Sequence, residues 1–338
     1  MSERSMSNEH PTIHDVAKLA GVSKSLVSLV MRGAPQVSDA RRAAVKKAAA
    51  ELGYRPNAAA KHLVQGRTFV IGVVVADLHN PFYADMVDSI EQAATRADYR
   101  ILIGSGFQSP DREAVAVDTF LQLRVDGLIL TGSTIPASDI EKAAETVPVV
   151  LASRSSTSDA IDSVVVDDPA GAIMAVEHLI QLGHRRIAHI HGGEGSGALA
   201  RREGYERAMA AAGLGKHVIS EPGRHIEQGG MDATRLLLAG RHRPTAIFAS
   251  NDLAAFGALS VAKDHGLKVP EDLSVIGFDN TSMSRIAAID LTTIDQRGSD
   301  QAAAAVSLLL ERLEGRTETR RIVVEPNLVR RSTTAMAR

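Results

Sequence analysis

The 338-residue chain contains no cysteine, which excludes disulfide bonds and metal sites built on thiolates. It also lacks any apolar run of about 18 residues, the length that a membrane-spanning helix needs. The first ten residues, MSERSMSNEH, are polar, so we expect no export signal there. Neither a G-x-S-x-G nucleophile elbow nor a P-loop occurs. These absences favour a soluble cytoplasmic protein with no membrane partner, and they give no support to enzymes of those two classes.

Positive charge is concentrated near the N-terminus. The whole chain has a formal net charge of −2, yet residues 1–66 carry ten Lys or Arg against five Asp or Glu. Binding to a phosphate backbone requires local rather than total positive charge. The distribution therefore favours a small DNA-facing module at the N-terminus, although solvated helix faces alone would also explain it.

Residues 12–32 have the pattern of two short amphipathic helices separated by a turn at Gly21. Thr12 and Ser23 stand where each helix needs an oxygen to accept its free backbone NH groups. Apolar residues recur at helical spacing before and after the turn, namely Val16, Ala17, Leu19 and Ala20, then Leu26, Val27 and Val30. The capping, the turn and the flanking charge predict a DNA-binding helix-turn-helix, with an unrelated small three-helix domain as the alternative.

A third helix is expected from Ser38, a capping residue, to Gly53, which is placed to end it. Pro56 then disfavours helix at the residue before it, and Asn57 can cap a new helix on its C-terminal side. Residues 58–64 are therefore interpreted as a separate short helix. Seven residues make barely two turns, so we expect its order to depend on a partner chain or on DNA.

From Phe69 onward, short β-branched runs alternate with Ala-rich helical segments. The runs cover residues 70–75, 101–104, 127–130, 149–152, 164–166, 187–190, 246–249 and 275–278. Apolar strands separated by helices predict an α/β body of parallel sheets, in one large sheet or two smaller ones. Ligands bind beyond the carboxyl ends of such strands, so the candidates there are Asp77, Asn80, Phe82, Ser153, Arg154, Asn251, Asp252 and Asp279.

Several short motifs succeed one another in an order typical of a known family. They are DVAKLAGVS at 15–23, LGYRPNAAA at 52–60, NPF at 80–82, GHRRIAHI at 183–190, ARREGY at 200–205, RPTAIFASND at 243–252, LSVIGFDN at 273–280 and LTTIDQ at 291–296. Several of them are weak alone. Together they resemble the LacI/GalR family of transcriptional regulators over nearly the whole chain.

The resemblance implies a ligand-switched, non-enzymatic regulator, a repressor, that acts as a homodimer. Paired heads would read a pseudo-palindromic operator in double-stranded DNA, and paired hinge helices would enter the minor groove. The body would resemble a periplasmic sugar-binding protein, with two doubly wound parallel-sheet subdomains closing on a small effector. The implied division is a head at 1–57, a hinge helix and linker at 58–67 and a body at 68–338, with lobe 1 at 68–161 and 291–321 and lobe 2 at 162–290 and 322–338.

The resemblance also assigns DNA contacts. These fall on Thr12, Ser23, Lys24, Ser25, Ser28, Leu29, Arg32, Tyr54, Asn57, Lys61 and Leu63. Leu29 stands where the family usually has an Arg, which reads guanine, whereas leucine can only contact a thymine methyl. Packing of Leu29 into the head core is the alternative. Leu63 matches the hinge leucine that wedges between base pairs, with dimer packing as its alternative.

The effector positions of the family fall on a mixed polar and aromatic set. Its members are Asp77, Phe82, Tyr83, Ser153, Arg154, Arg201, His225, Asn251, Asp279 and Gln296. A guanidinium, an amide and a carboxylate beside aromatic faces suit a sugar or polyol. Ser153 replaces an Asp that is common in relatives, and His225 and Gly195 replace a Phe and an Arg of purine-binding members, which weakens the purine-responsive alternative. Asn251 could instead simply cap the next helix.

Other functions find weaker support. Residues 193–198 satisfy G-x-G-x-x-A, but Glu221 stands at too long a distance for a dinucleotide site. His184, His189 and His191 cluster around one strand without the further ligands typical of a metal site. We therefore expect no cofactor and no metal. A periplasmic-type sugar receptor is the main rival, against which the basic head argues, and the tail lacks the apolar heptads of a coiled-coil tetramer.

Overall fold

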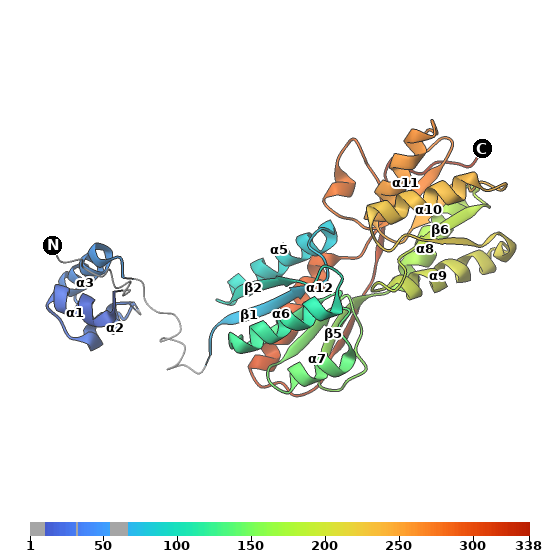
Figure 1. The fold of residues 1–338 in the computed structure, drawn as a ribbon. Helices are drawn as coiled ribbons and strands as arrows, with labels where there is room; N and C mark the ends of the chain where they lie inside the picture. Colours follow the sequence, from blue (N-terminus) through green and yellow to red (C-terminus); the bar gives the residue numbers. More distant parts are fainter. Residues whose placement is uncertain (1–10, 32, 55–66) are drawn as a thin grey trace, which may run out of the picture. The chain divides into compact units, whose positions relative to one another are not determined.

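The computed structural model describes residues 11–31, 33–54 and 67–338, which belong to two compact units (Figure 1). The division between a head and a body falls between Thr68 and Phe69. The expected hinge helix lies outside the described residues, as do four expected DNA contacts, Arg32, Asn57, Lys61 and Leu63. Within the described ranges, no helix has both the length and the apolar character needed to cross a membrane.

The described residues of the head form three helices, α1 (Ile13–Ala20), α2 (Lys24–Met31) and α3 (Asp39–Leu52). Gly21 and Gly53 end α1 and α3 in the left-handed conformation, both with a φ of 64°, as expected for glycine after a helix. The small core that holds the helices together consists of Val16, Ala17, Val27, Val30, Val37, Val45, Ala48 and Ala49. The apolar pattern of the sequence thus yields the expected helix-turn-helix.

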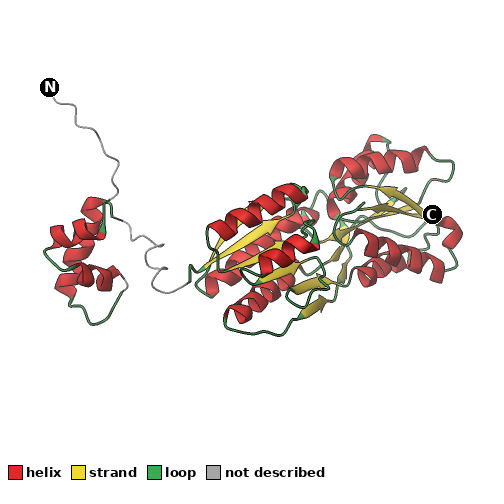
Figure 2. Ribbon diagram, turned by 60° about the horizontal axis from the view of Figure 1, so that its bottom comes forward, coloured by secondary structure: helices red, strands yellow, loops and turns green. Residues whose placement is uncertain are grey.

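The body contains two six-stranded sheets, each of which defines a lobe. The first sheet has the order β11-β5-β4-β3-β1-β2 and is parallel throughout. Its strands are β1 (Val70–Val75), β2 (Arg100–Ser105), β3 (Gly127–Thr131), β4 (Val149–Ala152), β5 (Asp162–Val166) and β11 (Arg321–Val324). Helices α5 (Pro81–Arg96), α6 (Pro110–Gln122), α7 (Ala137–Ala144) and α12 (Gly298–Leu313) cover its two faces (Figure 2).

The second sheet has the order β12-β10-β9-β8-β6-β7, with only β12 antiparallel to its neighbour. Its strands are β6 (Ile187–His191), β7 (Ile219–Pro222), β8 (Ala246–Ala249), β9 (Ser274–Asp279), β10 (Thr292–Asp295) and β12 (Asn327–Val329). Its helices are α8 (Asp168–Gln181), α9 (Ala198–Ala211), α10 (Glu227–Ala239) and α11 (Asp252–Asp264), and η1 (Gly215–His217) and η2 (Met283–Arg285) are single 3₁₀ turns. The inner strands β6, β8 and β9 are buried on both faces, which explains their largely apolar runs.

The chain passes between the lobes three times, each time one strand later than the resemblance implied. Strand β5 was assigned to lobe 2, but it pairs with β4 and β11 in the first sheet. Strand β10 was assigned to lobe 1, but it pairs with β9 and β12 in the second sheet. Strand β11 belongs to the first sheet rather than the second. The local sequence of a buried strand does not specify its partner, because the pairing is decided by contacts that are distant in sequence.

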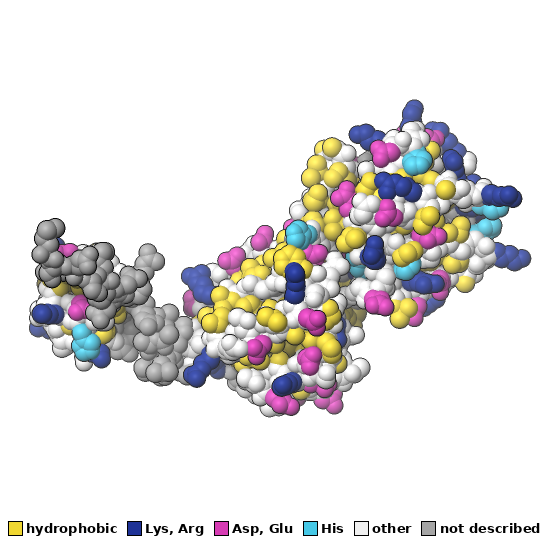
Figure 3. Space-filling view, viewed as in Figure 1, with side chains coloured by type: hydrophobic (Ala, Val, Ile, Leu, Met, Phe, Trp, Pro, Cys, Tyr) yellow, Lys and Arg dark blue, Asp and Glu magenta, His cyan; other side chains and the backbone are white. Residues whose placement is uncertain are grey.

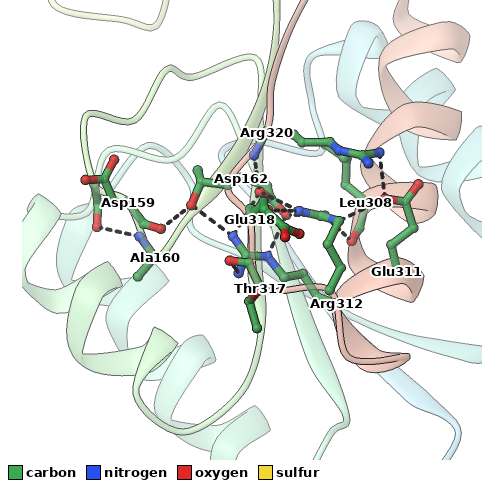
Figure 4. A network of polar contacts seen from close by, with 12 residues as sticks. Asp159, Ala160, Asp162, Leu308, Glu311, Arg312, Thr317, Glu318 and Arg320 are labelled. Atoms are coloured by element: carbon green, nitrogen blue, oxygen red, sulfur yellow. Dashed lines mark hydrogen bonds and ion pairs between the residues drawn. The ribbon is translucent and has the colours of Figure 1, made fainter.

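Asp162, the first residue of β5, anchors one such contact (Figure 4). Its buried carboxylate accepts hydrogen bonds from Arg312 Nε at 3.0 Å, Arg316 Nη2 at 2.6 Å and the backbone NH of Arg320 at 2.7 Å. Burial alone would raise the pKa of Asp162, but the bonds from Arg312 and Arg316 outweigh it and the pKa lies below its usual value. The ion cluster therefore fastens the end of α12 to the edge of the first sheet.

Candidate functional site

A cavity lies in the cleft between the two lobes, at the carboxyl ends of strands from both sheets. It is lined by Asn80, Phe82, Tyr83, Ser153, Val166, Asp168, Ser196, Arg201, His225, Asn251, Asp279 and Gln296. Eight of the ten expected effector residues are thereby brought together. A larger outer cavity shares seven of these lining residues and opens toward solvent.

Arg201, in the first turn of α9, is the central charged group of the cleft and only 5% exposed. Its Nε donates to Asp168 Oδ1 at 2.7 Å, and its Nη1 donates to the carbonyl of Ser250 at 2.6 Å. The same Nη1 lies 3.9 Å from Asp279 Oδ1, and the guanidinium stands 3.8 Å above the ring centroid of Phe278. A buried charge requires such partners. They hold the guanidinium in a single orientation.

Asp279 ends β9 with a φ of 134°, and its carboxylate accepts a hydrogen bond from the Gln296 side chain. Asp252, the first residue of α11, lies nearby and accepts from Thr281 and from Thr293. Burial, followed by the charge of Asp252, raises the pKa of Asp279 well above its usual value. Burial likewise raises the pKa of Asp252. The second lobe therefore holds two buried carboxylates with no arginine hydrogen-bonded directly to either among the described residues.

Asn251 has a double role at the carboxyl end of β8. Its side-chain oxygen caps α11 by accepting the NH of Ala254 at 2.9 Å, as the alternative interpretation of the sequence expected. Its amide nitrogen donates to the carbonyl of His225 at 3.1 Å. Since an amide nitrogen carries two hydrogens, a second NH is available toward the cavity that Asn251 lines.

The first lobe contributes an aromatic wall. Asn80 caps α5 by accepting the NH of Phe82 at 3.1 Å, and Pro81 occupies the first helical position. The rings of Phe82 and Tyr83 then meet edge to face, with centroids 5.3 Å apart. Gly132 has a φ of 59° and lies so close to the Tyr83 hydroxyl that a side chain would collide with it. Glycine at 132 is therefore what lets Tyr83 pack against this loop.

A chain of polar contacts joins the two lobes beneath the cavity. Ser153 has a left-handed backbone, with a φ of 59°, and its hydroxyl donates to Gln301 Oε1 at 3.0 Å. The Gln301 amide donates to the carbonyl of Gln296 at 2.7 Å, and Gln296 donates to Asp279. Ser196 of the second lobe donates to the carbonyl of Ser153. The residue that replaces the common Asp is thus part of the connection between the lobes.

His225 lies beside the glycine-rich loop that comes after β6. It has a φ of 55°, and its ring occupies the space where side chains at Gly192 and Gly195 would be. Burial, followed by the charge of Arg201, lowers the pKa of His225 to about 3. The imidazole is therefore neutral at physiological pH, and it requires the two glycines as neighbours.

Two expected effector residues lie outside the inner cavity. Arg154 lines the outer cavity, where its Nη1 donates to the carbonyls of Ser133 and Ile135 at 3.0 and 2.6 Å. Asp77 lines neither cavity. It accepts hydrogen bonds from His79 and from Gln108 instead. Arg154 shapes a loop at the mouth of the cleft, and Asp77 shapes the turn after β1.

Sequence reasoning missed Asp168 and Ser196. Asp168 stands just beyond the carboxyl end of β5, so the strand-end rule applied to residues 164–166 would have found it. Ser196 belongs to the glycine-rich loop, for which the family resemblance gives Gly195 as an effector position but not the serine that follows it.

The histidines around β6 do not converge on one point. His184 contacts Thr245, Ser274 and the carbonyl of Ala335. His189 is buried, bonded to the carbonyl of Phe248 and stacked on its ring at 4.7 Å. His191 accepts the NH of Gly193. Each histidine has a separate structural partner.

The head presents a polar first turn of α2. The Ser23 hydroxyl accepts the NH of Leu26 at 3.2 Å, which makes it the helix cap, and Lys24 and Ser25 are exposed. Ser28 and Leu29 are half-buried, and Leu29 packs against the head core, as the alternative for this residue expected. Thr12 donates through both its NH and its hydroxyl to Asp15. Tyr54 comes after α3 and packs against the head core.

Two family models match the chain. The model described as bacterial regulatory proteins of the lacI family matches residues 12–57. The model described as periplasmic binding proteins and sugar binding domain of the LacI family matches residues 68–332.

Curated relatives match the chain over most of its length. Catabolite control protein A of Priestia megaterium is 36% identical over 94% of this chain and 97% of its own. The regulator GalR of Escherichia coli K12 is 36% identical over 95% of this chain and 94% of its own.

Solved structures extend the likeness to the fold. The lac repressor dimer bound to operator and the anti-inducer ONPF has a TM-score of 0.82, is 28% identical, and matches 97% of this chain and all of that chain. The complex of the regulator CelR with cellobiose has a TM-score of 0.71, is 31% identical, and matches 96% of this chain and 99% of that chain.

Proposed function

The chain belongs to the LacI family of bacterial transcriptional regulators, and from this premise we propose that its body binds a neutral sugar or polyol in the interlobe cleft and thereby controls DNA binding by the head. As a member of that family it is a DNA-binding regulator and not an enzyme. A regulator of bacterial DNA acts where the DNA is, so the proposal includes a cytoplasmic location.

The observation that carries the proposal is the composition of the inner cavity. It combines a buried guanidinium, a buried carboxylate and an amide in the second lobe with two aromatic rings in the first. Each polar group can make two or more hydrogen bonds to hydroxyls, and aromatic faces cover the CH edges of a sugar ring. Arg201, Asn251 and Asp279 are proposed to bind the hydroxyls, and Phe82 and Tyr83 to cover the ring.

We propose that a homodimer reads the operator, because one solved relative is a repressor dimer bound to operator DNA. The body offers a face for a second copy of the chain. Figure 3 shows hydrophobic side chains gathered over β2 and α6 on one face of the first lobe. The exposed apolar side chains on β2, on α6 and directly beside them are Leu102, Ile103, Phe107, Val115 and Leu123. Such a surface is typical of a protein-protein interface.

The contacts between the lobes suggest how the switch works. Ser196 bonds to Ser153 on the cleft side, and the NH of Ser282 bonds to Asp85 at 2.9 Å elsewhere between the lobes. A ligand that bonds to both walls favours one separation of the lobes over another. Because the head is joined to the first lobe through β1, that separation is proposed to set the geometry of the paired heads on DNA.

The test is a thermal-shift screen of the full chain against neutral sugars and polyols. A ligand at about 100 times its dissociation constant adds roughly 2.7 kcal/mol to stability. A hit should then change the affinity of the protein for its operator, selected from a random DNA library, in fluorescence anisotropy at a fixed salt concentration. A panel without any hit, or a hit that leaves operator affinity unchanged, would contradict the proposal.

A substitution at Leu63 tests the proposed contact with DNA. Leu63, which lies outside the described residues, matches the wedging leucine of the family. Leu63→Ala should weaken operator binding strongly and binding to random DNA little, since a wedge is not a phosphate contact. Equal losses on both DNAs would exclude the wedge.

A further inference from the structure

The loop between β6 and α9 has the general form of an anion receptor. A strand ends at His191, residues 192–197 form a glycine-rich turn, and the 14-residue helix α9 begins at Ala198. Backbone NH groups at a helix N-terminus carry partial positive charge and bind phosphates or carboxylates in many proteins. Arg201 adds a full positive charge in the first turn of the helix. The glycine-rich motif satisfies a dinucleotide pattern, and the proposed function assigns no anionic ligand to it.

The chain already places an anionic group beside Arg201, because the carboxylate of Asp168 forms an ion pair with it. Asp168 Oδ1 lies 2.7 Å from Arg201 Nε. Both carboxylate oxygens lie against Gly197, the residue that precedes α9, so closely that a Cβ built there would be 2.8 Å from each. Asp168 lines the inner and the outer cavity. A ligand in the cleft therefore meets the negative charge of Asp168 next to the guanidinium of Arg201.

The positive charge of Arg201 is already balanced by carboxylates of the chain. Two of its nitrogens already donate to Asp168 and to the Ser250 carbonyl. Asp279 supplies a second carboxylate at 3.9 Å. A ligand carboxylate or phosphate would have to compete with Asp168 for Arg201 and leave that half-buried aspartate without its partner, which is costly.

We propose that Asp168 is a specificity-determining residue that makes the cleft select uncharged ligands over anionic ones, because the chain fills its own anion position. Sugar phosphates and sugar acids are rejected, and neutral sugars and polyols are accepted. This inference rests on the proposed function only for the identity of the cleft as the effector site. The anion position itself is defined by Asp168, Arg201 and the glycine-rich loop.

The experiment titrates inorganic phosphate into the full-length protein and measures its heat of binding and its thermal stability. Wild type should show no saturable binding in the cleft. Asp168→Asn keeps the shape and removes the charge, so it should raise phosphate affinity about tenfold or more, as charge-assisted bonds to Arg201 become available. Asp168→Ser serves as a second variant in case the asparagine perturbs folding. Adding Arg201→Met to Asp168→Asn should abolish the gain.

Glu177→Gln is the matched control, because it removes the same charge from an exposed position of the same helix. Phosphate binding to the basic head is common to every variant and cancels in the comparison. Saturable binding to wild type that Arg201→Met removes would overturn the inference, as would equal phosphate affinities in wild type and both Asp168 variants. A screen of neutral sugars without any hit would contradict the proposed function but leave the gained phosphate site of Asp168→Asn intact.

Discussion

The two lobes treat their buried carboxylates in opposite ways. In the first lobe, Asp162 is fully buried and is held by two arginines and a backbone NH, and its pKa lies below the usual value. In the second lobe, Asp252 and Asp279 are also buried, but their hydrogen-bond donors are hydroxyls, a backbone NH and an amide, and their pKa values are raised. Both lobes share one architecture, so the difference lies in the side chains.

The difference indicates two roles, a structural one for the carboxylate of Asp162 and a ligand-binding one for the carboxylate of Asp279. Asp162 has its full set of donors from the protein and lines neither the inner nor the outer cavity. Asp279 borders the inner cavity, where hydroxyl groups of a ligand can supply the donors that the protein omits. Titratable groups with raised pKa values in a cleft are typical of functional sites. Substitution of each carboxylate in turn tests whether the two kinds are distinct.

The largest effect is expected for Asp162→Ala. It leaves Arg312 and Arg316 without the carboxylate that joins α12 to β5 and β11. Breaking a buried ion pair from one side typically costs about 3–5 kcal/mol of the free energy of unfolding. Chemical denaturation should show this loss, while the folded protein keeps its affinity for the effector. An effector affinity that falls together with stability would mean that the two carboxylates do not differ in role.

The next effect concerns the ligand. Asp279→Ala should lower effector affinity on the order of 10- to 1000-fold, because buried ligand hydroxyls lose a charged partner. Stability and the operator affinity of the effector-free protein should change little. Isothermal calorimetry measures the first quantity and fluorescence anisotropy the last.

Asp300→Ala is the control for this variant, since it removes an exposed carboxylate paired with Arg297. Unchanged affinity in Asp279→Ala would place the ligand elsewhere. Loss of operator binding without ligand would assign Asp279 a structural role.

The sequence alone predicts features that depend on local signals, but not those that depend on contacts between distant segments. Helix caps, the turn at Gly21 and the apolar runs are local signals, so the head and the α/β body could be predicted. Strand-end positions identified five of the twelve residues that line the cavity, and the family resemblance added Tyr83, Arg201, His225 and Gln296. Lobe membership of β5, β10 and β11 could not be predicted, because it is decided by partners such as Arg312 and Arg316, which are about 150 residues from Asp162. The ion pair of Asp168 with Arg201 depends on that same long-range arrangement.

The pH dependence of stability gives a third, smaller effect. A carboxyl group whose pKa is raised in the folded protein destabilises the fold when it is ionised. The pKa of Asp252 is near 4 in the unfolded chain and about 6 in the folded protein, so its contribution to the free energy of unfolding decreases as the pH rises through this range. The contribution of Asp252 should therefore become less favourable by about 1 kcal/mol between pH 5 and pH 7.

Asp252→Asn tests this pH dependence. It should be less stable than wild type near pH 5, where both side chains are neutral and only the geometry differs, and the deficit should shrink toward pH 7. Unfolding curves of both proteins across this range measure the difference. A deficit that stays constant with pH would show that Asp252 does not titrate there.

The smallest effect concerns the polar chain between the lobes. Gln301 is buried and does not line the inner cavity, yet it accepts a hydrogen bond from Ser153 and donates one to the carbonyl of Gln296, and both of these residues line that cavity. Gln301→Leu keeps the volume and removes both bonds, so the two ligand-facing residues lose their fixed orientation. We expect effector affinity to fall about fivefold, or roughly 1 kcal/mol.

A general loss of stability could cause the same decrease, so a double-mutant cycle with Ser153→Ala provides the decisive measurement. If Gln301 acts by positioning Ser153, the loss in affinity from Gln301→Leu should shrink once the serine hydroxyl is absent, with a coupling energy of about 0.5 kcal/mol or more. Leu236→Ala, an exposed position on α10, is the control and should show additive effects with Ser153→Ala. If the losses in effector affinity from Gln301→Leu and Ser153→Ala are additive as well, Gln301 does not position Ser153 and contributes only to packing. Coupled losses in effector affinity would mean that Gln301 contributes to ligand binding by positioning Ser153, since the Gln301 side chain accepts the hydrogen bond of the Ser153 hydroxyl.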